Sequence, residues 1–152
     1  MVLNTRMITN ISFDEIYQIW NYYLWPTRES TIETNSAMNF LGGYDIKNML
    51  STPTFFAYRL DNKIVGVNSG HLCHDNSYRS RGLFVFPEYR KQGIGKILLV
   101  ATINQGINEG TNYIWSYPKQ SSWPTYEASG FSLASAWETS ELDINAYCKF
   151  IV

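Results

Sequence analysis

The sequence has little cysteine: Cys73 and Cys148 are the only two among its 152 residues. A disulfide framework is therefore not indicated, and we expect a reducing, cytoplasmic setting. His71 and His74 lie close to Cys73 in the sequence. Zinc sites, however, need three or four ligands and a second shell of supporting residues, and the sequence holds no second Cys/His cluster. We therefore expect no metal.

An excess of charge and a long apolar run are also missing. Lys plus Arg number 12 and Asp plus Glu 13, for a formal net charge of −1. Nucleic-acid-binding proteins leave a basic footprint, so no nucleic-acid partner is expected. No apolar run approaches the ~20 residues that span a bilayer, and residues 1–11 lack the apolar segment of a secretory signal. We expect no membrane partner. Hydrophobic residues make up 45% of the chain, which predicts one globular domain over residues 1–152.

Periodicity and turn residues predict alternating helices and strands. A capping box, Ser12-Phe13-Asp14-Glu15, opens a helix that Pro26 ends. A second, shorter helical region is predicted at 29–50, broken by Gly42-Gly43. Further helices are predicted at 92–108 and 121–129, and strands at 1–9, 54–60, 63–72, 78–86, 113–117, 131–138 and 142–152.

One stretch carries a recognisable chemistry. A strand, Leu83-Phe84-Val85-Phe86, stops at Pro87 and leads through a basic, glycine-containing turn at 90–96 into an apolar helix. The first N–H groups of a helix have no partner inside the helix, and the helix dipole favours an anion there. Glycines let the backbone approach that anion closely. The turn therefore predicts a phosphate site, the alternative being a glycine turn with solvated basic side chains.

The spacing decides which phosphate loop it resembles. A P-loop fails because Arg90 stands where its first glycine must be, and Ile97 replaces the magnesium-binding hydroxyl. A dinucleotide fingerprint fails because Leu98 replaces its third glycine. The pattern L-x-V-x-P-x-x-R-x-x-G-x-G, from Leu83 to Gly95, closely resembles the signature of the GNAT superfamily, the acetyl-CoA-dependent N-acetyltransferases.

The resemblance implies an α/β GNAT fold: a central, mixed, mostly antiparallel and splayed sheet of about six to seven strands, flanked by about four helices. In that fold the strand before the loop carries a bulge. The resemblance implies that Leu83, Phe84 and Val85 contact the pantetheine arm of acetyl-CoA, and that the Val85 N–H faces the developing oxyanion. The residues implied to contact the pyrophosphate are Arg90, Lys91, Gln92, Gly93, Ile94, Gly95 and Lys96.

A second match, Tyr126-Glu127-Ala128-Ser129-Gly130-Phe131, fits the family pattern Y-x-x-x-G-F. It implies that Tyr126 is the general acid that protonates the leaving thiolate. A thiol has a reference pKa of about 8.5 and a phenol about 10, so this transfer costs on the order of 2 kcal/mol. Alternatively, Tyr126 is a packing residue. The family's Asn seven residues earlier is replaced by Lys119, so Ser121 or Ser122 is the expected substitute for contact with the cofactor.

The general base departs from the family pattern. Relatives place a carboxylate one or two residues before the Leu of L-x-V, where this chain has Arg81 and Gly82. An acyl-CoA-binding module without catalysis is therefore one alternative. The remaining candidate bases, some of them acting through water, are Glu29, His71, Glu138 and Glu141.

The acceptor is predicted from cations and aromatics. Arg79 and Arg81 have strand spacing and share a face, where they bind an anionic substrate group or are solvated edge cations. Trp25 and Arg28 belong to an aromatic segment that walls the acceptor pocket or is core. Together they favour a small primary amine that carries an anion. A protein or peptide N-acetyltransferase is the alternative, and because relatives often dimerise a homodimer is also open.

Overall fold

The computed structural model describes residues 7–43 and 52–152. Its helices are α1 (Phe13–Ile19), α2 (Ile94–Asn108) and α3 (Trp123–Ala128), with a π-helical turn at Trp20–Leu24 and 3₁₀ turns at Pro87–Tyr89 and Gln120–Ser122. Its strands are β1 (Ile8–Asn10), β2 (Thr54–Leu60), β3 (Lys63–Leu72), β4 (Ser77–Val85), β5 (Tyr113–Ser116), β6 (Ser132–Leu133), β7 (Glu138–Thr139), β8 (Ile144–Asn145) and β9 (Cys148–Ile151). The predicted first strand lies partly outside the described residues.

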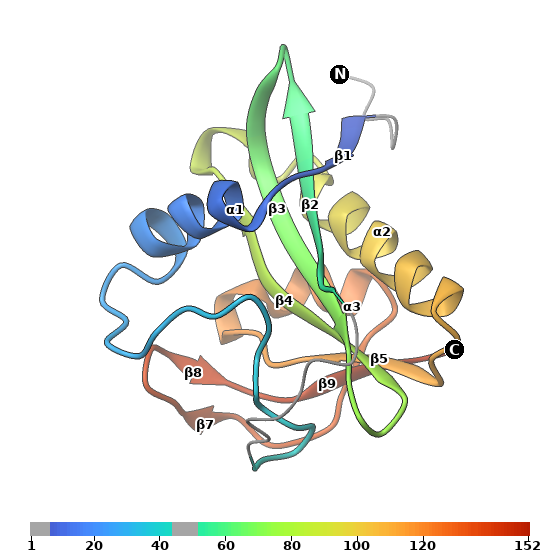
Figure 1. Ribbon diagram of the computed structural model, residues 1–152. Coiled ribbons are helices and arrows are strands. Elements are labelled where there is room, and N and C mark those ends of the chain that lie inside the picture. The colour runs from blue at the N-terminus through green and yellow to red at the C-terminus, as the bar shows by residue number, and fades with distance from the viewer. Residues whose placement is uncertain (1–6, 44–51) are drawn as a thin grey trace.

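Seven of these strands form one sheet in the order β1-β2-β3-β4-β5-β9-β6 (Figure 1). The β4–β5 pair is parallel and every other pair in this sheet is antiparallel. The predicted mixed, mostly antiparallel sheet is confirmed. The last two predicted strands are each divided into two shorter ones. Of these, β7 and β8 leave the sheet and pair with each other as a separate hairpin.

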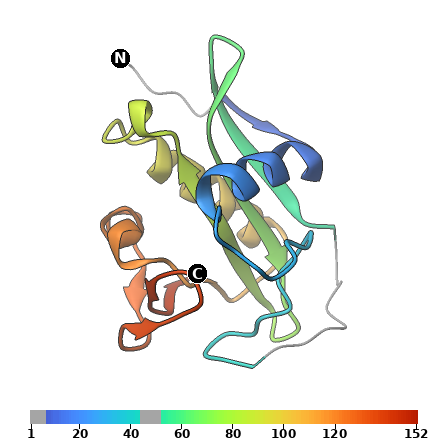
Figure 2. The same ribbon diagram turned by 90° about the vertical axis from the view of Figure 1, so that its left-hand side faces the viewer.

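The two faces of the sheet are covered by different helices (Figure 2). Side chains on a strand alternate between faces. Phe55 and Ala57 pack with α1, whereas Phe56 and Tyr58 pack with α2. The hairpin between β2 and β3 turns at Asp61-Asn62, where both residues have positive φ, as a tight two-residue turn requires.

The first helix begins as predicted, with the Ser12–Glu15 capping box formed in both directions. The predicted helix at 29–50 is wrong for residues 29–43, which contain no helix, and its remainder lies outside the described residues. The structure therefore describes three α-helices instead of about four. Long-range bonds hold this segment irregular: Arg81 Nη1 donates to the Glu33 carbonyl at 2.8 Å, and Ser36 N donates to His71 Nε2 at 3.3 Å.

The expected bulge and splay lie on β4. Val67 of β3 pairs with Phe84 and Ser69 pairs with Arg81, so two residues of β4 lie opposite one residue of β3. Arg81 and Phe84 therefore face the same side of the sheet. Gly82 stands within the bulge with φ of 78°, a conformation that suits glycine. On the other side, β4 pairs with β5 only as far as Arg79. Beyond that point the two strands diverge and open a gap in the sheet.

Candidate active site

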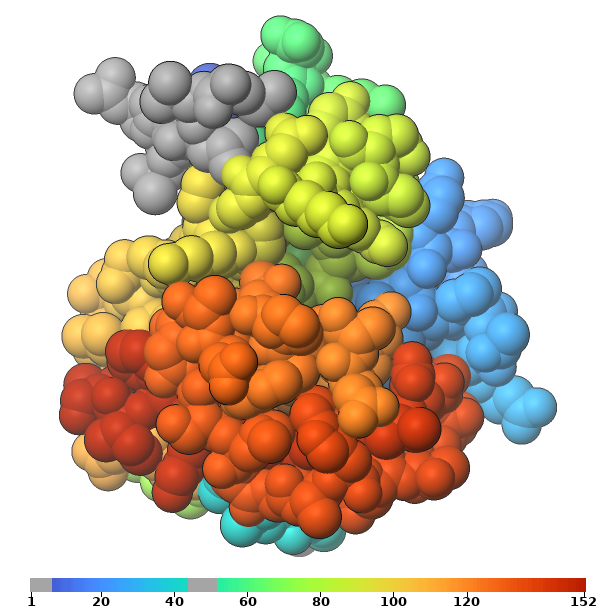
Figure 3. All heavy atoms as spheres, turned by 180° about the vertical axis from the view of Figure 1, so that it is seen from behind, coloured from blue at the N-terminus to red at the C-terminus, as the bar shows by residue number. Residues whose placement is uncertain are grey.

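A groove of about 590 Å³ follows this gap, between the end of β4, the start of α2 and α3. Figure 3 shows the hollow between the yellow-green atoms of the turn before α2 and the orange atoms near α3. Its lining residues are Leu24, Leu83, Phe84, Val85, Tyr89, Arg90, Lys91, Gly93, Ile94, Gly95, Lys96, Lys119, Ser121, Ser122, Pro124, Thr125 and Ala128. These include every cofactor-contact residue expected from the sequence except Gln92.

The turn before α2 presents backbone to the groove. Gly93 has φ of 83° and precedes the helix, and its carbonyl accepts a hydrogen bond from Ile97 N at 3.1 Å. The helical N–H groups before Ile97 have no carbonyl inside the helix to bind. A Cβ on Gly95 would lie 3.0 Å from the Thr125 side chain across the groove. The turn can therefore hold an anion against bare backbone.

The backbone of Val85 faces the gap. Phe86 N donates to Val65 O at 2.9 Å, so the neighbouring pair Gly66–Val85 is the non-hydrogen-bonded kind of antiparallel pair. The N–H and C=O of Val85 then point away from β3, toward the side where β5 has diverged. Arg90 Nε donates to the Val85 carbonyl from that side at 2.7 Å. The N–H of Val85 lies beside it in the groove.

Tyr126 lies at the inner end of the gap and is 3% exposed. Ser116 Oγ donates to the Ser80 carbonyl at 2.7 Å and is 3.4 Å from Tyr126 Oη. Burial raises the pKa of Tyr126 above its ordinary value, so the phenol keeps its proton at every physiological pH. It can act as a proton donor at the point where β4 and β5 separate.

A second cavity, of about 780 Å³, adjoins the groove. The two share Leu24, Leu83, Lys119 and Ser122 in their linings. The second cavity is also lined by Trp25, Arg28, Arg79, Arg81 and Tyr126, by the segments 30–38 and 42–43, by residues 116–118 and by the β7–β8 hairpin. The four residues predicted to bind the acceptor therefore surround one space that communicates with the groove.

Arg81 is enclosed by aromatic rings. Its guanidinium carbon lies 4.9 Å from the Trp20 ring centroid and 5.3 Å from that of Trp25, on whose ring Arg28 also stacks at 4.8 Å. The side chain is 4% exposed. The alternative that Arg79 and Arg81 are solvated edge cations is wrong, because β4 is an interior strand and both side chains are buried.

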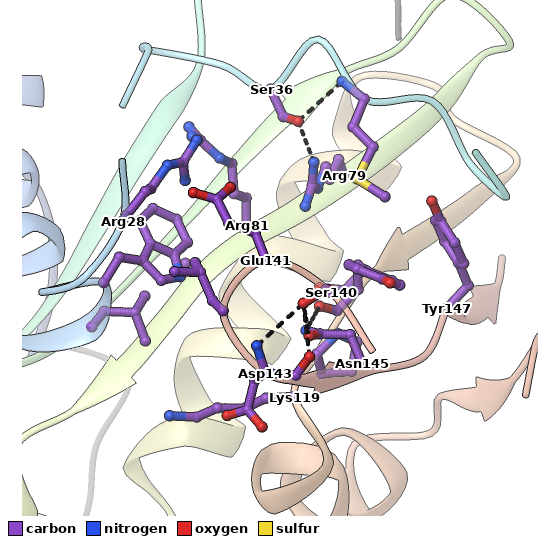
Figure 4. Close-up of a pocket in the computed structure, with 18 of the residues that line it drawn as sticks. Arg28, Ser36, Arg79, Arg81, Lys119, Ser140, Glu141, Asp143, Asn145 and Tyr147 are labelled. Atoms are coloured by element: carbon purple, nitrogen blue, oxygen red, sulfur yellow. Dashed lines mark hydrogen bonds between the residues drawn. The ribbon is translucent and has the colours of Figure 1, made fainter. Parts of the chain in front are cut away.

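Arg79, two residues before Arg81 on β4, is held in the same way. Its guanidinium lies 4.8 Å from the Trp115 ring and donates a hydrogen bond to Ser36 Oγ (Figure 4). Burial lowers the pKa of Arg79 to about 10, which still leaves it charged. The only salt bridge between two described residues joins Arg59 to Glu15. Arg79 and Arg81 therefore face the cavity as buried cations with no described carboxylate against them.

Comparison with known proteins agrees with this geometry. The Acetyltransferase (GNAT) family model matches residues 11–131. The chain belongs to this family. The GNAT chain resembles an acetyltransferase of the GNAT family from Staphylococcus aureus MU50, with 17% identity over 95% of this chain and 97% of that one, and a TM-score of 0.65. No curated protein sequence matches it significantly.

Two of the similar structures are described as complexes with coenzyme A. One is a Bacillus subtilis acetyltransferase, with 13% identity over 95% of the GNAT chain and 97% of that chain, and a TM-score of 0.66. The other is the PaiA N-acetyltransferase of Thermoplasma acidophilum, with 18% identity over 66% of the GNAT chain and 61% of that chain, and a TM-score of 0.56. At these identities the likeness establishes the fold.

Two of the four candidate bases in the GNAT chain line the second cavity and two do not. His71 is buried, and burial together with the charges of Arg79 and Arg81 lowers its pKa to about 3. Its Nε2 already accepts a hydrogen bond from Ser36 N, and His71 is not among the residues that line the cavity. Glu29 is not among the lining residues, whereas Glu138 and Glu141 are.

The cavity also holds lining residues that the sequence reasoning missed, among them Glu33, Ser36 and Asp143. Only Asp143 had a sequence signal, its close spacing to Glu138 and Glu141. Within residues 7–43 and 52–152, no helix is long and apolar enough to cross a membrane, and no three His, Cys, Asp or Glu side chains form a metal cluster.

Proposed function

We propose that this GNAT protein transfers the acetyl group of acetyl-CoA to the primary amine of a small acceptor that also carries an anionic group. The observation that carries the proposal is the pair of buried guanidinium groups, Arg79 and Arg81, in a cavity that opens into the groove. A buried charge without a partner is costly. Two such cations are retained most readily where a ligand supplies the opposite charge.

The groove has the features that the cosubstrate needs. Its basic turn, with Arg90, Lys91, Lys96 and the backbone around Gly93 and Gly95, would hold the pyrophosphate. Leu83, Phe84 and Val85 would contact the pantetheine arm as an added strand contacts a sheet edge. Ser122 lines both cavities and would contact the inner end of that arm. Gln92 lies outside this lining.

When bound, acetyl-CoA supplies an acetyl group activated as a thioester. The Val85 N–H would donate a hydrogen bond to the acetyl oxygen as negative charge develops there, because it points into the gap with no strand partner. Tyr126 would give its proton to the departing sulfur. The acceptor's anion would bind Arg79 and Arg81, whose planar guanidinium groups suit a carboxylate. Trp25 and Arg28 would line the acceptor's other side.

A screen of matched acceptors tests the function. Amino acids, their amides and their decarboxylated amines are incubated with acetyl-CoA, and thiol release and acetylated products are measured, the products by mass spectrometry. We expect the carboxylate-bearing member of each set to be acetylated best. Preferred acetylation of polyamines or basic peptides would contradict the anionic acceptor. Absence of acetyl-CoA binding at millimolar concentration would sink the assignment of the cosubstrate.

A binding module without catalysis is the competing function, favoured by one observation. The β4 positions expected to carry a carboxylate are Arg81 and Gly82, and the Gly82 bulge is filled by the Trp20 indole. Such a module would bind acetyl-CoA, would bind it more weakly with Gly93→Glu, and would release no thiol with any amine. Thiol release above the uncatalysed rate therefore separates the two functions.

A further inference from the structure

Two buried arginines and the carboxylates of the hairpin lie around the acceptor cavity, and Arg28 and Lys119 also belong to its lining. Arg79 and Arg81 come from β4, whereas Glu138, Glu141 and Asp143 come from the hairpin of β7 and β8. None of these five forms a salt bridge with another described residue. The buried arginines of β4 and the exposed carboxylates of the hairpin therefore do not neutralise each other by contact.

The hairpin is joined to the strand that leads to Tyr126. Glu138 pairs with Asn145 across it, and Asn145 Nδ2 donates to the Tyr117 carbonyl at 2.9 Å. The Tyr117 hydroxyl donates to Glu138 Oε1 at 2.7 Å. Tyr117 directly follows Ser116, whose Oγ is 3.4 Å from Tyr126 Oη. Glu138 is thus oriented from the chain segment that also supports Tyr126.

Glu141 and Asp143, the other carboxylates of the hairpin, are held by different partners. Both oxygens of Glu141 are bound at the rim, to Glu29 N at 3.3 Å and to Ser30 Oγ at 3.2 Å, and Figure 4 shows Glu141 reaching toward Arg28. These bonds, the one from the Glu29 backbone first, lower the pKa of Glu141. Asp143 Oδ1 accepts from the backbone N of Ile144 at 2.7 Å.

Glu33 lies beside the buried arginines, since its carbonyl accepts from Arg81. What distinguishes Glu138 from these carboxylates is that the chain segment supporting Tyr126 also orients it. Its Oε1 is fixed by Tyr117, and its Oε2 accepts no hydrogen bond from a described residue. It is exposed, so a proton taken up from the cavity can pass directly to water.

We propose that Glu138 receives the proton that the acceptor's ammonium must lose, and so replaces the carboxylate that β4 lacks. This inference rests on the proposed function. An alkylamine has a reference pKa of about 10.4, so only about one molecule in 2500 is neutral at pH 7. An acceptor whose carboxylate binds Arg79 and Arg81 would direct its ammonium away from these cations and toward the hairpin.

The transfer balances as follows. The ammonium gives one proton to Glu138, which passes it to water. The neutral nitrogen forms the C–N bond as the thioester C–S bond breaks. Tyr126 protonates the departing sulfur and recovers the second nitrogen proton as the amide forms. The products are the N-acetylated acceptor, the free thiol of coenzyme A and one proton in solution.

Two acceptors matched in length test this role. β-Alanine has an alkylamine that is protonated at neutral pH. Aminooxyacetate has the same length and the same carboxylate, but its nitrogen is neutral there because the adjacent oxygen withdraws electrons. We expect Glu138→Gln to lower kcat/KM for β-alanine by about 10² or more and to move its rise with pH to higher pH. With aminooxyacetate the variant should stay within about threefold of the wild type.

Glu141→Gln is the matched control, since it makes the same change on the same hairpin. Any effect it has should fall equally on both acceptors. Tyr117→Phe, which frees Glu138, should reproduce part of the β-alanine defect. Equal losses of Glu138→Gln with both acceptors, or no loss with β-alanine, would overturn the proposal. Acetyl-CoA affinity and the thermal midpoint of each variant report folding. A wild-type protein that releases no thiol with any amine would overturn the proposed function, and this inference with it.

Discussion

Trp20 Nε1 donates a hydrogen bond of 2.8 Å to the carbonyl oxygen of Gly82. The same indole fills the space beside Gly82, where a Cβ would lie 2.4 Å from ring atoms, and the guanidinium of Arg81 stacks on it. A single side chain from the π-helical turn that follows α1 therefore fixes the bulge of β4 and the orientation of a buried arginine. The opening of the groove and the buried arginine of the cavity are coupled through Trp20.

Gly82→Ala should be strongly destabilising. An L residue pays roughly 1–2 kcal/mol at positive φ, and the new methyl group would also collide with a fully buried indole. We expect the free energy of unfolding to fall by more than about 2 kcal/mol, as measured by urea denaturation. Gly110→Ala is the control, since Gly110 has φ of 81° with open space around it. Equal losses would show that Trp20 moves aside at little cost.

Much of the fold followed from local signals. The strands β2 and β3 begin and end where alternation and the Asp61-Asn62 turn placed them. The capping box fixed the start of α1, and Gly93 and Gly110 bracket α2. Each of these signals acts within a few residues of the feature it specifies, so the sequence displays it directly.

The segment 29–43 and the π-helical turn were not predictable in this way. Arg81 reaches Glu33 across 48 positions of the chain, and Ser36 reaches His71 across 35. Such side-chain bonds to a backbone far away in sequence override local helix propensity. The π turn, closed by Trp25 N donating to Trp20 O at 2.7 Å, brings Trp25 to Arg81, and no local pattern announces it. The aromatic cage of the cavity therefore emerged only with the tertiary structure.

Tyr126→Phe should lower kcat by about 10² or more and leave the Kd for acetyl-CoA nearly unchanged, because the change removes a proton donor and little contact area. Since burial raises the pKa of Tyr126, ionisation of this residue should not lower the wild-type kcat below about pH 10. Stopped-flow thiol release over a pH series measures both. Tyr113→Phe, whose hydroxyl binds Asp75 away from both cavities, is the control and should keep the wild-type rate.

Replacing a buried arginine of the cavity should separate binding from stability. Arg79→Met removes a charge that has no carboxylate partner, so the free energy of unfolding should stay unchanged or rise by up to about 2 kcal/mol. The KM for the anionic acceptor should rise about 10-fold or more, as expected for losing a charge-assisted hydrogen bond, while acetyl-CoA affinity is kept. Arg59→Met, at the partly exposed pair with Glu15, should leave the KM unchanged and alter the stability little. An unchanged acceptor KM in Arg79→Met would contradict the anion site.

His71 should make the protein sensitive to acid. Burial, followed by the charges of Arg79 and Arg81, lowers the pKa of His71 to about 3 in the folded protein, whereas an unfolded histidine has a pKa of about 6.5. Between these values the unfolded chain binds a proton that the folded chain does not, so stability falls as pH falls. From pH 7 to pH 5 this one residue should cost about 2 kcal/mol of unfolding free energy. His71→Gln, whose amide oxygen can still accept from Ser36 N, should flatten the pH dependence by that amount in urea titrations. His74→Gln, the same change at an exposed position, is the control. If His71→Gln keeps the wild-type slope, His71 takes up its proton over the same pH range in the folded and the unfolded protein, and burial does not hold the imidazole neutral.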